Sequence, residues 1–265
     1  MFYIAKFKTM KIKNSNINYI TFGKGPKPLI MIQGLNTNKL SKSAKLVALM
    51  YTEFIKDYTV YIFDRRSETF DGITVNDLAS DVIDAMDALE IKNADILGVS
   101  EGGMIAQVIA IERSDLVRRL VLTVTASNTN ELIEKTINNW ISLTEEENYK
   151  ELIKDMAYKL YSDRYLKKYK LFMPLLTLLQ KPKDKEWFLH LLKSCLTVNT
   201  TDTLNQIKCE TLVIGGKKDL IVGVDASYDI ARSLNCDVKI YENLGHALYE
   251  EAKDFNKIVY NFFNE

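Results

Sequence analysis

The sequence has few of the residues that mark extracellular, disordered or nucleic-acid-binding proteins. Its three cysteines are odd in number and far apart, which fits free thiols in a reducing cytosol and matches no zinc-ligand spacing. Eleven glycines and four prolines in 265 residues argue against long disordered linkers. The 35 basic residues equal the 35 acidic ones in number, so no charge excess points to a nucleic acid or an anionic membrane as a partner.

Long hydrophobic runs are also absent. The longest, at 171–179, is far too short to span a bilayer, and the N-terminal residues alternate apolar and polar instead of forming the apolar stretch of a signal peptide. We therefore expect a cytoplasmic protein without stable membrane association. The hydrophobic content of 47% is sufficient for one substantial core that carries an insertion.

Short apolar runs alternate with amphipathic segments along most of the chain. Residues 2–8 and 16–22 alternate like the strands of a hairpin that turns at 13–15. Thr74 and Asp77 have the spacing of a helix capping box. Apolar runs predict buried strands at 29–32, 60–63, 95–99, 120–124, 211–214 and 237–241, and the pattern between them predicts helices near 41–56, 74–89, 103–112, 225–234 and from about 249. This order predicts a mostly parallel α/β sheet with antiparallel strands at its start.

The alternation stops after the sixth strand, where residues 128–207 are mainly helical in pattern. One helical face is expected to carry Leu132, Ile133, Ile137, Trp140 and Ile141. We predict a core formed by 1–127 and 208–265, with 128–207 inserted into it as a helical cap.

The most informative motif is Gly98-Val-Ser100-Glu-Gly102, which directly follows an apolar strand and opens a helix. This is the arrangement of a nucleophile elbow, a sharp strand-to-helix turn that exposes a serine hydroxyl. The glycines are needed because the turn forces neighbouring backbone segments together. Ser100 is therefore the candidate nucleophile, provided that a base lies beside it.

Histidine is the most common general base, and the chain has only two. His246 lies between the last strand and the last helix, which places it at the same sheet edge as Ser100. His190 lies inside the helical insertion, where a half-buried structural histidine is the simpler interpretation. We predict that His246 is the base.

An imidazole base needs a carboxylate to hold its tautomer. Asp219 follows the strand at 211–214 and is the favoured candidate, although an aspartate in such a turn can also be purely structural. Asp225 lies further along and is expected to cap a helix. No acidic residue occurs between Leu120 and Ser127, which excludes a carboxylate from the end of the sixth strand.

The chain order Ser100, Asp219, His246 resembles that of the α/β-hydrolase family, and specifically its small esterases and lactonases with a helical cap. Further segments that match the family are Met31-Ile-Gln-Gly34, Phe63-Asp-Arg-Arg66, Asp115-Leu-Val-Arg-Arg-Leu-Val-Leu122 and Gly215-Gly-Lys-Lys-Asp219. The resemblance implies a mostly parallel eight-stranded sheet flanked by helices, with a helical cap inserted after the sixth strand. Serine at the nucleophile position distinguishes the chain from relatives that carry aspartate there, the dehalogenases and epoxide hydrolases.

The resemblance also implies an oxyanion hole formed by the backbone N–H groups of Leu35 and Glu101. Gln33 and Gly34 stand where relatives have His-Gly, and Ser67 stands where relatives tend to have glycine. The loop at 64–69 is expected to pack behind the site, with Arg65 and Arg66 in salt bridges that fix it.

Candidate substrate-pocket residues are Gln33, Gly34, Trp140, Phe172 and Met173, the last two in an apolar segment that could line the cleft or form a lipid-facing lid. Glu101 either stabilises its helix N-terminus or lines the pocket and disfavours anionic acyl groups. Both interpretations stay open at this point.

We expect a serine hydrolase that cleaves a small or medium apolar carboxylic ester, thioester or lactone through an acyl-serine intermediate, without cofactor or metal. Other chemistry of the same triad remains an alternative: aminopeptidase, carbon–carbon hydrolase or acyltransferase activity. A different class of protein is also open, a hydrolase-fold ligand sensor with little turnover. The expected partner is a small-molecule substrate and not a nucleic acid, and the protein is expected to be a monomer or homodimer.

Overall fold

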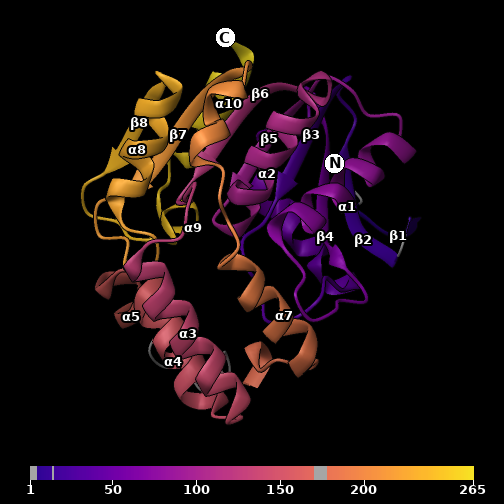
Figure 1. Cartoon of the computed structure of the whole chain (residues 1–265). Coiled ribbons are helices and arrows are strands. Elements are labelled where there is room, and N and C mark those ends of the chain that lie inside the picture. Colours follow the sequence, from indigo (N-terminus) through magenta and orange to yellow (C-terminus); the bar gives the residue numbers. More distant parts are fainter. Residues whose placement is uncertain (1–4, 14, 170–177) are drawn as a thin grey trace.

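The computed structural model describes residues 5–13, 15–169 and 178–265 and contains one eight-stranded sheet in the order β1-β2-β4-β3-β5-β6-β7-β8 (Figure 1). The strands are β1 (Lys6–Ile12), β2 (Ser15–Gly23), β3 (Lys27–Ile32), β4 (Tyr58–Arg66), β5 (Ala94–Val99), β6 (Val117–Thr123), β7 (Glu210–Gly216) and β8 (Asp237–Tyr241). β2 runs antiparallel to both of its neighbours, β1 and β4, and every pair from β4 to β8 is parallel. The predicted sheet class is therefore confirmed.

Two hydrophobic cores cover the two faces of the sheet. Helices α1 (Val75–Ala88), α2 (Glu101–Glu112) and α8 (Val224–Leu234) contribute to one core, and the 3-10 helix η1 (Lys42–Tyr51) and α10 (Phe255–Asn264) contribute to the other. The capping box predicted for α1 is present, because the Thr74 hydroxyl accepts from the N–H of Asp77 and the Asp77 carboxylate accepts from the N–H of Thr74.

The segment after β6 forms a group of helices beyond one end of the sheet (Figure 1). Its elements are α3 (Glu131–Glu145), α4 (Tyr149–Leu160), α5 (Asp163–Tyr169), α7 (Lys185–Cys195) and the 3-10 helix η4 (Thr201–Gln206). Asn130 and Asp184 cap α3 and α7 by accepting backbone N–H groups, at 2.9 Å from Ile133 and 3.1 Å from Trp187. Ile133, Ile137 and Trp140 are buried on α3 as predicted.

Several predicted boundaries are wrong. Residues 2–4 of the predicted first strand lie outside the described residues, and β1 extends beyond the predicted end to Ile12. β4 continues to Arg66, so the first half of the predicted loop at 64–69 is strand. The predicted helix near 41–56 is a 3-10 helix, and the predicted C-terminal helix is two helices, α9 (Leu248–Glu251) and α10. On α3, Leu132 is 36% exposed although it shares the apolar periodicity, because the outer edge of that stripe faces away from the core.

Close backbone approach at the β5–α2 turn explains its glycines. A Cβ atom on Gly102 would lie 2.0 Å from the carbonyl oxygen of Ile32, and one on Gly98 would lie 2.6 Å from the carbonyl oxygen of Gly102. Both contacts are with backbone, which cannot rotate away as a side chain could. The turn can therefore form in this geometry only with glycine at these positions.

We predict that Gly102→Ala lowers the free energy of unfolding by about 3 kcal/mol, because overpacking against backbone forces α2 away from β3. The control is Gly72→Ala, since Gly72 has a φ of +80° but no atom within 4 Å of an added Cβ, so that only backbone strain of about 1 kcal/mol applies. Denaturant unfolding of both variants measures the difference. Equal losses would show that backbone contact at Gly102 is not the constraint.

Candidate active site

Ser100 lies in the tight turn between β5 and α2, with a φ of +55° that is rare for a residue with a side chain. Its N–H donates to the carbonyl of Thr123 at 2.9 Å, and its carbonyl accepts from the Thr125 hydroxyl at 2.8 Å. These bonds hold the turn from the end of β6, the neighbouring strand, and from the segment that follows it. The strained conformation presents the hydroxyl at the carboxyl edge of the sheet, as the sequence motif predicts.

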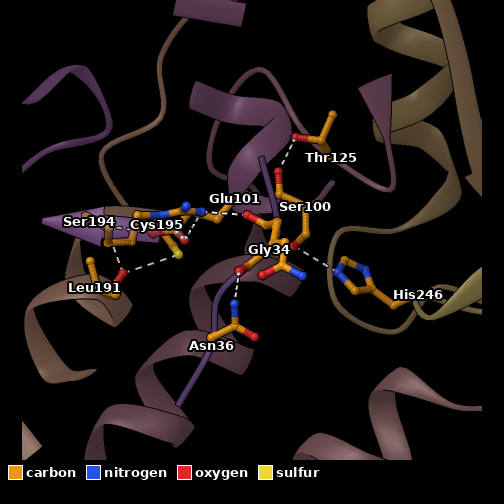
Figure 2. Close-up of polar contacts among 11 residues, drawn as sticks. Gly34, Asn36, Ser100, Glu101, Thr125, Leu191, Ser194, Cys195 and His246 are labelled. Atoms are coloured by element: carbon orange, nitrogen blue, oxygen red, sulfur yellow. Dashed lines mark hydrogen bonds and ion pairs between the residues drawn. The ribbon is translucent and has the colours of Figure 1, made fainter. Parts of the chain in front are cut away.

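The structure brings Ser100, His246 and Asp219 together in one hydrogen-bonded chain. His246 Nε2 lies 2.9 Å from Ser100 Oγ (Figure 2), and His246 Nδ1 lies 2.8 Å from Asp219 Oδ2. Asp219 follows β7 and His246 follows β8, so all three side chains meet at the carboxyl ends of parallel strands. His246 and Asp219 are buried, whereas Ser100 is half-buried and accessible.

The second oxygen of Asp219 is fully engaged. Asp219 Oδ1 accepts from the backbone N–H of Ile221 at 2.8 Å and of Val222 at 3.0 Å. These two bonds fix the carboxylate so that Oδ2 faces the imidazole. An imidazole with its proton on Nδ1 can donate to this oxygen, and that tautomer leaves Nε2 free to accept the proton of the serine hydroxyl.

Leu35 and Glu101, whose N–H groups are the predicted oxyanion donors, both lie at the Ser100 cavity. Both residues line the same cavity as the Ser100 side chain, and neither N–H donates a hydrogen bond to any described residue. The Glu101 N–H lies at the N-terminus of α2, where helix geometry leaves backbone donors unpaired. Two unpaired donors next to a nucleophile can stabilise a developing oxyanion.

The cavity at Ser100 is small and predominantly apolar, with a volume of about 50 Å³. Of the predicted pocket residues, Gly34 and Trp140 line it, Gln33 does not, and Phe172 and Met173 lie outside the described residues. Sequence reasoning did not identify several further lining residues: Met104, Met156, Leu160, Cys195, Ile221, Val222 and Tyr249. Most of these side chains are apolar, and the sequence does not distinguish an apolar residue that lines a cavity from one in the ordinary core.

Glu101 forms a buried ion pair with Arg65. Arg65 Nη2 and Nε lie 2.9 Å and 3.1 Å from Glu101 Oε2, and the two side chains are 5% and 1% exposed. The Ser194 hydroxyl, from α7, lies 3.3 Å from the other carboxylate oxygen and 2.8 Å from the carbonyl oxygen of Leu191. The carboxylate at the cavity wall is thus balanced by a cation behind it.

Arg66 forms a second buried pair, with Asp81 of α1, at 2.6 Å and 2.7 Å. The predicted salt bridges of Arg65 and Arg66 are therefore confirmed, although both residues belong to β4 and not to a loop.

The other histidine, the other candidate aspartate and the three cysteines are not part of the Ser100–His246–Asp219 chain. His190 lies on α7, where its Nδ1 is 2.9 Å from the Thr69 hydroxyl, and it does not line the cavity. Asp225 lies in the first turn of α8 and does not cap it, because the N-cap is Gly223. All three cysteines are unpaired, and burial raises the pKa of the Cys195 thiol, which the negative charge of Glu101 raises further.

Across 5–13, 15–169 and 178–265, no helix combines the length and apolar character of a membrane span. In the same ranges, no group of three or more histidine, cysteine or acidic side chains is placed to hold a metal ion.

Residues 27–253 match the family model of the alpha/beta hydrolase fold. The chain belongs to the alpha/beta hydrolase family. The resemblance inferred from the sequence is thus confirmed, and so is the fold class that it implied.

Curated relatives in this family match part of the chain. A 2-hydroxymuconate semialdehyde hydrolase from Pseudomonas putida is 29% identical over 69% of this chain, and a 3-oxoadipate enol-lactonase from Acinetobacter baylyi is 30% identical over 46% of it. The matched segments span 66% and 46% of the lengths of those relatives. Among solved structures, an enol-lactonase from Burkholderia xenovorans LB400 superposes with a TM-score of 0.85 at 20% identity, covering 97% of this chain and 100% of the other.

Asp64, near the end of β4, is a buried carboxylate next to the site. Its Oδ2 accepts from the N–H of Leu40 at 2.7 Å and so holds the segment that follows Leu35. Burial raises the pKa of Asp64 to about 6, an effect that the backbone donors of Arg65 and Leu40 only partly oppose.

We predict that Asp64 makes folding less favourable as pH rises from about 4 to about 7. Its pKa is higher in the folded than in the unfolded chain, so the stabilisation is complete below the unfolded pKa and is lost as pH rises through 6. The expected change is about 3 kcal/mol relative to Asp64→Asn, which keeps an acceptor for Leu40 but does not titrate. Urea unfolding of both proteins at several pH values measures it, and a pH-independent difference would contradict it.

Proposed function

We propose that the protein is a serine hydrolase that cleaves a small, apolar carboxylic ester or lactone through an acyl-serine intermediate. The observation that carries this proposal is the hydrogen-bonded chain from Ser100 through His246 to Asp219. The two unpaired N–H groups beside Ser100 and the membership of the family support it.

The geometry supports the following sequence of steps. Ser100 Oγ attacks the carbonyl carbon while His246 Nε2 takes the hydroxyl proton, and the carbonyl oxygen becomes an oxyanion that accepts from Leu35 and Glu101. The tetrahedral intermediate collapses, and the leaving alcohol takes the proton from His246. His246 then removes a proton from water, which attacks the acyl-serine, and the acid product leaves as Ser100 regains its proton.

The cavity argues for a short, uncharged acyl group. Its volume is only about 50 Å³, and its walls are mostly aliphatic and aromatic. The Arg65 guanidinium is paired with the carboxylate of Glu101, so it is not a free positive charge for an anionic acyl group. Helices α3 and α4 supply much of the wall, so we propose that 128–207 acts as the cap of the site.

A substrate that is not an ester is the second candidate. One curated relative is named as a 2-hydroxymuconate semialdehyde hydrolase, and another is named as an enol-lactonase. The same three side chains can serve carbon–carbon hydrolysis, amide hydrolysis or acyl transfer, because each begins with attack by an activated serine.

A cytoplasmic location remains part of the proposal.

We predict that a fluorophosphonate probe labels the wild type at Ser100 and does not label Ser100→Ala. We also expect Ser100→Ala to lose several orders of magnitude in kcat for p-nitrophenyl butyrate, because the nucleophile is gone. Mass spectrometry of the labelled peptide identifies the site. Failure of the native protein to label would contradict the hydrolase proposal and favour a ligand sensor.

We predict that kcat/KM falls as the acyl chain of p-nitrophenyl esters grows from two to about eight carbons, and that Met156→Ala shifts the preference toward longer chains. Met156 lines the cavity, so shortening it enlarges the acyl site, and the octanoate-to-butyrate ratio should rise by about tenfold.

The matched control for this prediction is Leu152→Ala, one turn earlier on α4, since Leu152 is buried but does not line the cavity. An equal change of the ratio in both variants would show that general loosening of the cap, and not the cavity wall, sets chain length.

A further inference from the structure

We propose that Asn36 and Arg65 are positioning residues of the oxyanion hole, because together they hold both peptide units that flank Gly34. This inference rests on the proposed function, in which the N–H of Leu35 stabilises the oxyanion. Nothing in the sequence motifs marks Asn36, and Arg65 was expected only to fix a loop.

The orientation of the Leu35 N–H depends on Gly34. No cis peptide bond is present in the described chain, so the carbonyl of Gly34 and the N–H of Leu35 belong to one planar unit and point in opposite directions. Glycine permits more backbone conformations than any other residue, and a rotation of this unit would turn the N–H away from Ser100. A larger residue would restrict that freedom only at the cost of displacing Ser100, because a Cβ on Gly34 would lie 3.0 Å from the Cβ of Ser100.

Asn36 holds the peptide unit that follows Gly34. Its Nδ2 donates to the carbonyl oxygen of Gly34 at 3.2 Å (Figure 2). Within the described residues this is the carbonyl's only hydrogen bond. The bond is made on the side of the peptide unit opposite the N–H, so it keeps the Leu35 N–H directed at the site. A hydrogen bond to the carbonyl also polarises the peptide unit, which makes its N–H a stronger donor.

Arg65 holds the peptide unit that precedes Gly34. Its Nη2 donates to the carbonyl of Gln33 at 2.6 Å and, from the same nitrogen, to Glu101 Oε2 at 2.9 Å. One guanidinium therefore joins the segment that carries the first proposed donor to the residue whose N–H is the second. A planar fork with several donors can serve both acceptors, which a lysine ammonium at the same place does less well.

The peptide unit of the second donor, the N–H of Glu101, is held without a positioning side chain of this kind. The carbonyl of Ser100, in the same peptide unit as the Glu101 N–H, accepts from the N–H groups of Gly103 and Met104 at 2.8 Å and 3.2 Å as well as from Thr125. Helix α2 thus fixes that unit through its own backbone. The asymmetry locates the vulnerable half of the oxyanion hole at Gly34 and Leu35, and hence at Asn36.

The test uses Asn36→Ala and the isosteric Asn36→Asp, in which no amide remains to donate. Removal of an oxyanion donor costs about 10²–10³ in kcat, so loss of its positioning residue should cost about tenfold to a hundredfold in kcat with KM changed less than about twofold. Affinity for a trifluoromethyl ketone, whose adduct with Ser100 carries an oxyanion, should fall by the same factor. Arg65→Lys should show the same division between kcat and KM.

The matched control is Asn38→Ala. Asn38 lies in the same loop and bonds to Thr37, Lys181 and Lys183 but to neither peptide unit at Gly34, so its loss loosens the loop without touching the donor. We expect it to lower Tm at least as much as Asn36→Ala while kcat stays within about twofold of wild type. Unchanged kcat in both Asn36 variants, or an equal loss in Asn38→Ala, would overturn the positioning role alone. If the wild type showed no turnover, or only turnover that persists in Ser100→Ala, the proposed function and this inference would both be overturned.

Discussion

Contact between the first turn of α2 and the end of β3 is the constraint on which the site depends. The Cα of Gly102 lies so close to the carbonyl of Ile32 that no side chain fits between them. This approach places the start of α2 directly beside the segment that follows β3. As a result Ser100, the N–H of Glu101 and the N–H of Leu35 share one cavity, although they come from two different strand ends. Any displacement of α2 would separate the nucleophile from both proposed donors at once.

The same contact buries a carboxylate, and the sheet supplies the cation that this burial requires. An unpaired ionised group with 1% exposure would cost several kcal/mol, and breaking such a pair is strongly destabilising. Arg65 reaches Glu101 because β4 lies next to β3, and β3 lies next to β5, in the sheet order. The pair thus connects three adjacent strand ends. A neutral residue at position 101 would avoid the cost of burial but would leave Arg65 unpaired.

The parts of the site that could be predicted from the sequence are those fixed by strand ends. Ser100, Asp219 and His246 each follow a recognisable apolar run, and parallel strands bring their carboxyl ends to one edge. The partner of Glu101 could not be predicted in the same way, because it depends on β4 continuing to Arg66 and on a strand order that differs from the chain order. The residues of the cavity wall could not be predicted either, since apolar periodicity identifies a buried face but not the element that it packs against.

The wall of the cavity and the proposed base are physically connected. The carbonyl of Leu160, a lining residue at the end of α4, accepts from the N–H of Ala247, the residue after His246, at 2.8 Å. Two residues further on, Ser162 bonds through its backbone N–H and its hydroxyl to the carboxylate of Glu251 in α9. Helix α4 and the His246 loop are therefore held as one unit. A ligand or substitution that shifts the wall at Leu160 will also move the loop that carries the imidazole, so acyl preference and proton transfer are not independent in this fold.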